Sequence, residues 1–116
     1  MAPGSLELLK GTLDVLVLRA LSVEAMHGYG VSRWIGETTA GILEVEEAAL
    51  YQALHRMERR GWLISEWGRS AKNRKAKFYA LTEAGRTQLE KETGVMRRHV
   101  RALVLVLGLE PGEALR

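Results

Sequence analysis

The spacing of apolar residues switches from a helical period to a strand period and back again along this chain, and these two switches limit the folds that it can adopt. From Leu6 to Arg60 apolar side chains recur about every three to four residues, which predicts helices. The stretches WLISEWG and KAKFYALT alternate instead, as half-buried strands do, and the polar, turn-prone RSAKNR lies between them. The helical period then returns from Glu83 to Leu107. The sequence therefore predicts helices, one β-hairpin and a final long helix.

Three helices are expected before the hairpin, over about Leu6–Leu21, Gly28–Thr38 and Glu46–Arg60. The first is apolar nearly all round, so it must be buried on more than one side, and we expect a partner subunit to supply part of the cover. The inner faces of the other two are expected at Val31, Trp34, Ile35, Leu50, Ala53, Leu54 and Met57.

Short signals mark the ends of these elements. Gly61 is a natural stop for the third helix, and Thr82 can cap the last one. In the hairpin, Phe78 is expected in the core with its neighbours facing out, and Trp62 is expected to be core as well.

The predicted fold class is mainly α with a two-stranded β-wing, a winged helix-turn-helix plus a long C-terminal helix. We expect residues 1–82 to form the winged helix-turn-helix domain and residues 83–116 to form a dimerisation helix. The first and last helices carry more apolar surface than a monomer of this size can cover. The expected dimerisation residues are Leu9, Leu13, Leu16, Leu89, Met96, Val100, Leu103 and Leu107.

Charge is concentrated in the middle of the chain. The formal net charge is only +3, but nine basic and three acidic residues lie between Ala48 and Arg86, whereas eight basic and eleven acidic residues make up the rest. This bias favours a surface that faces a polyanion.

The candidate DNA-binding residues come from three places. The hairpin contributes Arg69, Lys72, Asn73, Arg74, Lys75 and Lys77, and the long cationic side chains among them would neutralise phosphates. The outward face of the third helix contributes Tyr51, Gln52, His55, Arg56 and Arg59. Tyr29, in the MHGYG entry of the second helix, contacts either a phosphate or the core. The alternative for all of them is an ordinary solvated surface.

Other classes of protein are not indicated. The three histidines have no partner at helical spacing and there is no cysteine, so no metal site or disulfide is expected. No nucleophile motif or phosphate loop appears, so we expect neither an enzyme nor a cofactor. No signal peptide or membrane span is expected, which suits the cytoplasm.

Four ordered motifs resemble the PadR family of transcriptional regulators: LLKGTLDVLVLRAL, MHGYGVS, LYQALHRMERRGW, and SEWG followed by NRKAKFYALTEAGR. They run from about Leu8 to Leu89. The resemblance implies a dimer, built by its first and last helices, that represses transcription, and the short C-terminal part is similar to the compact branch of the family. This chain departs from the family's common GSLYPAL by having AALYQAL, which places Gln52 where relatives carry proline.

The predicted function is sequence-specific binding of a double-stranded DNA operator by a homodimeric regulator, expected to be a repressor. The alternative is a winged-helix module that binds another protein. The sequence identifies no small-molecule effector and no operator.

Overall fold

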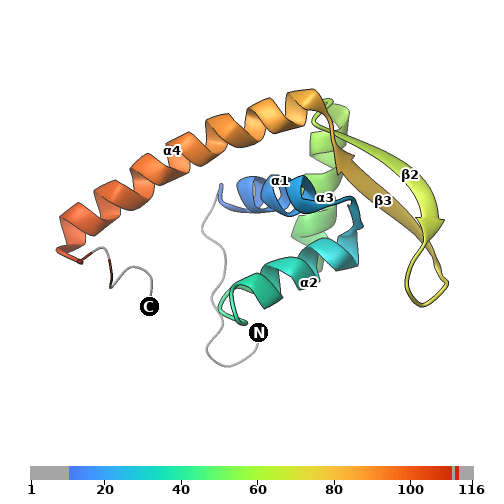
Figure 1. Ribbon diagram of the computed structural model, residues 1–116, viewed down its shortest axis with the longest axis horizontal. Coiled ribbons are helices and arrows are strands. Elements are labelled where there is room, and N and C mark those ends of the chain that lie inside the picture. Colours follow the sequence, from blue (N-terminus) through green and yellow to red (C-terminus); the bar gives the residue numbers. More distant parts are fainter. Residues whose placement is uncertain (1–10, 111, 113–116) are drawn as a thin grey trace.

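The computed structural model describes residues 11–110 and 112. Three helices surround a small core, a hairpin extends from one end, and a long helix extends toward the other (Figure 1). The elements, in order, are α1 (Leu13–Val23), β1 (Met26–His27), α2 (Gly28–Thr38), α3 (Glu47–Arg59), β2 (Leu63–Arg69), β3 (Lys75–Leu81) and α4 (Glu83–Leu107). This is the predicted winged helix-turn-helix order with its long last helix.

Helix α1 lies at the centre of the fold, between α4 and α2 (Figure 1). It packs against α2, α3, β3 and α4, and Val17, Leu18 and Ala20 are fully buried. The chain's own elements therefore cover most of the all-round apolar surface for which the sequence suggested a partner subunit. Residues before Gly11, including the start of the predicted helix and Leu9, lie outside the described residues.

Helices α2 and α3 form where their apolar periods predict them. Val31 and Ile35 on α2 are buried, and Trp34 packs half-buried against the core. All four predicted inner positions of α3 are buried: Leu50, Ala53, Leu54 and Met57.

The turn after α3 is built on Gly61. Its φ of +81° is a left-handed conformation that glycine adopts without steric cost, as the sequence suggested for the end of this helix.

The sheet has three antiparallel strands in the order β1-β3-β2, rather than the two that the sequence predicts. The added strand β1 pairs Met26 with Tyr79 and His27 with Phe78. Two residues are too few to show an alternating pattern, which explains why β1 was missed.

The expected burial of Phe78 is wrong. Tyr79 is the buried residue, 2% exposed, because it lies on the sheet face that meets the core. Phe78 lies on the opposite face, half-buried, with its ring edge-on to His27 at 5.2 Å between centroids.

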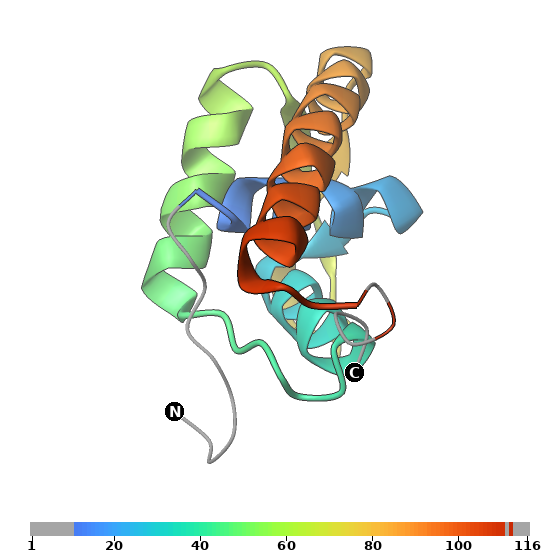
Figure 2. The same ribbon diagram turned by 90° about the vertical axis from the view of Figure 1, so that its left-hand side faces the viewer.

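The first turn of α4 is fixed to the turn between α3 and β2. The Thr82 hydroxyl accepts a hydrogen bond from the Gly85 amide at 3.0 Å, which confirms the predicted cap, and donates to the Gly61 carbonyl at 2.7 Å. A Cβ at Gly85 would lie 2.1 Å from the Trp62 carbonyl oxygen, so only glycine allows this approach. The helix continues unbroken through Gly94, and its C-terminal half projects away from the body (Figures 1 and 2).

Candidate nucleic-acid interface

The outward face of α3 presents polar and aromatic side chains to solvent. Gln52, His55 and Arg59 are exposed. Tyr51 is partly exposed, and its ring lies against Gly28 at the start of α2, where any Cβ would be 2.8 Å from the ring. The glycine therefore lets Tyr51 rest on the start of α2, which holds the ring in a defined place beside Gln52.

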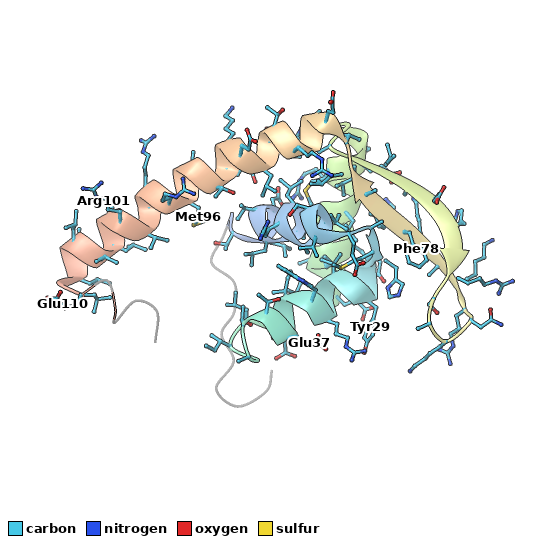
Figure 3. All side chains as sticks on the ribbon, in the orientation of Figure 1. Tyr29, Glu37, Phe78, Met96, Arg101 and Glu110 are labelled. Atoms are coloured by element: carbon cyan, nitrogen blue, oxygen red, sulfur yellow. The ribbon has the colours of Figure 1, made fainter. Side chains whose placement is uncertain are left out.

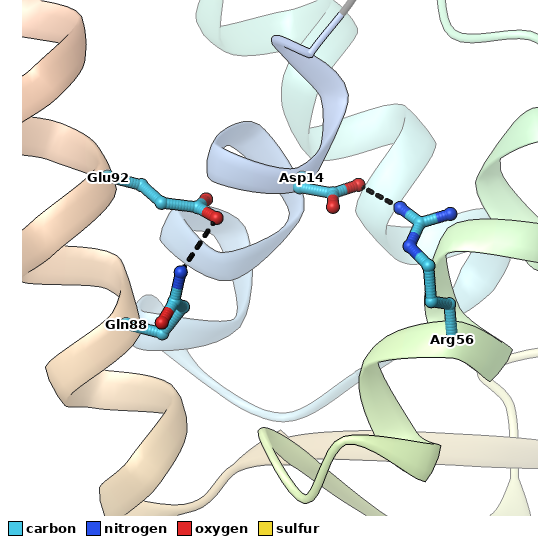
Figure 4. A network of polar contacts seen from close by, with 4 residues as sticks. All are labelled: Asp14, Arg56, Gln88 and Glu92. Atoms are coloured by element: carbon cyan, nitrogen blue, oxygen red, sulfur yellow. Dashed lines mark hydrogen bonds and ion pairs between the residues drawn. The ribbon is translucent and has the colours of Figure 1, made fainter.

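Arg56, predicted on the same surface, has another partner. Its guanidinium donates to the carboxylate of Asp14 on α1, 42 residues away in sequence, and both side chains are partly buried (Figure 4). The ion pair links α3 to the central helix. The same view shows Gln88 donating to Glu92 at 3.0 Å on α4.

The hairpin tip is a short turn whose cations are exposed, with the Arg69 guanidinium donating to the Asn73 carbonyl at 3.4 Å. The Asn73 amide donates to the Ser70 carbonyl, and the Ser70 amide donates to the Arg74 carbonyl, each at 2.8 Å. Asn73 has φ of +57°, a left-handed conformation that asparagine adopts more readily than most residues. The predicted tip residues are all exposed: Arg69, Lys72, Asn73, Arg74 and Lys75.

Glu58 connects α3 to both strands of the hairpin. Its carboxylate accepts a hydrogen bond from the Ser65 hydroxyl on β2 and lies 3.3 Å from the Lys77 ammonium on β3. The hydrogen bond from Ser65, assisted by the charge of Lys77, holds the pKa of Glu58 below its ordinary value despite some desolvation. Lys77, predicted as a DNA contact, is therefore half-buried in an ion pair within the chain.

Glu58, Ser65, Lys77 and Tyr79 form a cluster between α3 and the hairpin, called the Glu58 cluster below, and burial changes the pKa of Tyr79 within it. The Tyr79 phenol has a raised pKa, mainly because burial disfavours its charged form. The Lys77 ammonium lies 5.6 Å from the centre of the Tyr79 ring. The cluster places one face of the hairpin toward α3.

The start of α2 has one exposed aromatic residue. Tyr29 is 65% exposed and its ring stacks near that of His27, 6.2 Å between centroids. The His27 Nδ1 atom accepts a hydrogen bond from the Gly30 amide at 2.9 Å. His27 thus caps the helix, while Tyr29 stays open to solvent.

Sequence reasoning assigned no role to Trp67, which is 63% exposed on β2. The Lys75 ammonium lies 4.8 Å from the centre of its ring. The other two tryptophans, Trp34 and Trp62, are half-buried against the core. The sequence signal for it was a tryptophan near the end of the alternating stretch WLISEWG, close to the basic turn.

Some of the predicted dimerisation residues pack against the chain's own core, and others are exposed toward the end of α4. Leu13, Leu16 and Leu89 pack, half-buried, against the chain's own core, and Met96 is half-buried on α4. From about Met96 onward, side chains of α4 project away from the body of the molecule (Figure 3). The apolar ones among them are exposed, Leu103 by 47% and Val106 by 82%. The other exposed members of this free end are Val95, Val100, Leu105, Leu107 and Leu109.

The described residues contain neither a cluster of metal ligands nor a membrane-spanning helix. Across residues 11–110 and 112, no group of three or more histidine, cysteine or acidic side chains could hold a metal ion. None of the helices in that part of the chain is long and apolar enough to cross a membrane.

Known proteins resemble this chain over most of its length. A protein from Lysinibacillus sphaericus named Uncharacterized protein X is 28% identical over 83 residues, which are 72% of this chain and 76% of that protein. The crystal structure of a PadR-like transcriptional regulator from Bacillus cereus is 26% identical, with a TM-score of 0.73 over 88% of this chain and 97% of that one.

A second solved structure shares the fold. Bacillus subtilis PadR in complex with operator DNA has a TM-score of 0.62 at 18% identity, covering 70% of this chain and 46% of that one. The sequence profile described as the transcriptional regulator PadR-like family matches residues 17–91, more than half of the chain. The chain therefore belongs to the PadR-like family of transcriptional regulators.

Proposed function

We propose that this regulator binds a specific double-stranded DNA operator as a homodimer, with α3 in the major groove and the β2–β3 hairpin along the backbone, and that it represses transcription. The observation that carries the proposal is the Glu58 cluster. Its bonds to Ser65 and Lys77 hold the hairpin against α3, so one helix surface and one cationic hairpin act as a single unit.

The hairpin cations supply affinity in this proposal. Lysine and arginine side chains near phosphates release bound counterions, which favours binding to any duplex sequence. The exposed cations assigned to this role are Arg69, Lys72, Arg74 and Lys75, and the neutral Asn73 between them is assigned a hydrogen bond to the backbone. Lys77 is assigned to positioning, because Glu58 already holds its ammonium.

The outward face of α3 supplies sequence readout. A major groove about 12 Å wide admits a helix, and a glutamine side chain can pair with the N6 and N7 atoms of adenine. Gln52 is exposed on this face between Tyr51 and the next turn, where His55 lies. We assign base contacts to Gln52 first, and to Tyr51, His55 and Arg59 beside it. Tyr29, exposed at the start of α2, is assigned to a phosphate.

Arg56 has a different role in this proposal from the other polar residues of α3. It was expected on this surface, but Asp14 takes its guanidinium. In the proposal it sets the position of α3 against α1 and does not contact DNA while that pair is intact.

Dimerisation follows from the free end of α4. Its exposed apolar side chains form a surface that a second copy of the same helix would cover, as in two-fold symmetric dimers. Two copies of α3 would then enter successive major grooves about 34–36 Å apart. Repression would come from blocking access of RNA polymerase to the promoter.

Two findings support the proposal from outside the chain. The family is one of transcriptional regulators, which is not a class of enzymes. The Bacillus subtilis relative of the same fold has operator DNA bound.

The rival function is a winged-helix module that binds a protein and uses its basic hairpin only for solubility. Binding of the intact protein to a random-sequence duplex, measured by anisotropy between about 50 and 200 mM salt, separates the two. A DNA-binding protein loses affinity steeply over that range, by about 0.9 in log–log slope for each phosphate contact. Absence of measurable binding at the lowest salt would favour the rival.

A further inference from the structure

Trp67 lies on the hairpin face that is turned toward α3. Side chains two apart on a strand share a face, and Ser65 on that face bonds to Glu58 of α3. Opposite Trp67 in the register is Lys77, which also reaches Glu58. The indole therefore occupies the same side of the hairpin as the contacts with α3, one step closer to the tip.

The tip side of the indole is bordered by cations. Arg69 and Lys75 are paired in register on this same face, and the Lys75 ammonium lies over the Trp67 ring at 4.8 Å. Both side chains stay accessible to solvent despite this contact: Lys75 is exposed, and Trp67 is 63% exposed. The pair presents a flat apolar surface and a positive charge side by side.

This combination has a specific chemical complement. An exposed indole offers a flat apolar ring face, and the Lys75 ammonium above the Trp67 ring adds a positive charge to it. The surrounding charge favours a polyanion, and a stacked cation keeps its charge while its side chain is held in place. A duplex backbone offers both partners at once, because each phosphate adjoins the apolar edge of a deoxyribose.

We propose that Trp67 and Lys75 form one joint contact with the backbone of double-stranded DNA. Lys75 neutralises a phosphate, and the indole packs against the neighbouring deoxyribose. The inference rests on the proposed function, and it assigns the hairpin a shape-dependent contact in addition to its charge. The contact adds affinity without reading a base, because every backbone step presents the same groups.

Tryptophan fluorescence tests the placement directly, because the chain has only three tryptophans. The intact protein is titrated with a random-sequence duplex at low salt, and binding is followed in parallel by the anisotropy of a labelled duplex. The expected result is that DNA quenches the emission and shields it from acrylamide. Trp67→Phe should remove most of both effects while binding is still seen by anisotropy.

Trp34→Phe is the matched control, since Trp34 is half-buried on α2 and outside the proposed surface. It should keep the fluorescence response of the wild type. If Trp67→Phe keeps the DNA-induced quenching and shielding, the response comes from another tryptophan and the inference is wrong. The inference is also wrong if raising the protein concentration without DNA produces the same change in emission, because the indole then contacts a second copy of the protein. If the wild type fails to bind the duplex by anisotropy, the proposed function itself is overturned.

A double-mutant cycle tests whether the two side chains act together. Trp67→Ala should weaken binding about three- to tenfold beyond any loss in the phenylalanine variant. Lys75→Gln should make the salt slope shallower by about 0.9. The combined variant should lose less than the product of the two single losses, because each single change already disturbs the shared contact. Independent losses would overturn the joint contact while leaving phosphate binding by Lys75 in place.

Discussion

The hairpin and the free end of α4 lie at opposite ends of the long axis (Figure 1). At the hairpin end the cations Lys72 and Arg74 are exposed at the very tip, with Trp67 exposed behind them. The free end of α4 also exposes Arg101, but it is set apart by its aliphatic side chains, with Leu105 and Val106 among the most exposed. Charge attracts over distance and is screened by salt, whereas apolar surface acts only in contact and is little affected by salt. The proposed function accordingly assigns affinity for a polyanion to the hairpin end and affinity for a second copy to the free end of α4.

The largest effect is expected from charging the apolar end. Leu103→Asp combined with Leu107→Asp should leave helical circular dichroism intact, because both side chains are exposed in the described chain. Self-association should fall by at least about a thousandfold, since burying two carboxylates costs several kcal/mol. Sedimentation at micromolar concentration measures this, and DNA binding should weaken with it. A wild-type protein that sediments as a monomer would contradict the proposed dimer.

The second effect concerns the cationic end. Replacing Lys72, Arg74 and Lys75 with alanine should weaken binding to specific and random duplexes alike, by roughly two orders of magnitude at 0.1 M salt if each contacts one phosphate. The log–log salt slope should become shallower by about 2.7. Sedimentation should be unchanged, because none of the three lies near α4. An unaltered slope would mean that the hairpin points away from DNA.

A third change separates charge from base readout. Gln52→Ala removes an exposed, uncharged side chain from α3 and should cost about 1–3 kcal/mol of discrimination at one base pair in each half-site. Affinity for random duplexes should stay close to that of the wild type. Binding-site selection on both proteins is the measurement. If both select the same operator, Gln52 does not read a base.

The smallest effect is expected at the link between α3 and the hairpin. The lowered pKa of Glu58 means that its carboxylate stabilises the fold most above its ordinary pKa, and that this stabilisation is lost as the pH falls through the lower folded-state value. Glu58→Gln should therefore reduce stability at pH 7 by less than about 1 kcal/mol, because the pair is partly exposed.

The difference between the two proteins should shrink as the pH falls below the ordinary glutamate pKa, because the wild-type carboxylate is then progressively protonated. Urea unfolding at pH 7 and at a series of acidic pH values measures it. A difference that grows in acid would contradict the assigned role of Glu58. Ser65→Ala is the matched control, since it removes the same hydrogen bond from the opposite partner.

Local patterns were enough to predict most of the elements. Helix α2 and helix α4 have the predicted bounds, and α3 differs by one residue at each end. The reason is that caps and periods act within one or two turns: Thr82 caps α4 through the Gly85 amide, three residues on. The inner face of α3 was predicted for the same reason, because core packing repeats at the helical period.

The tertiary structure decided which of the outward polar residues remain available. Arg56 lies on the outward side by spacing alone, but its partner Asp14 is 42 residues away on a helix that packs against α3. Lys77 has a partner 19 residues away in Glu58. Pairings over such distances depend on how whole elements dock, and no period within one element contains that information.

The sequence by itself determined the order of helices and strands, the winged helix-turn-helix class and the basic middle segment, because each depends on residue type and near neighbours. Only the tertiary structure decided that β1 joins the sheet, that Tyr79 rather than Phe78 faces the core, and that α1 is covered by its own chain. It also decided that Trp67 stands open beside Lys75. The physical reason is that burial is a property of packed surfaces, and two residues with the same local pattern can meet the core or the solvent according to which face the fold turns inward.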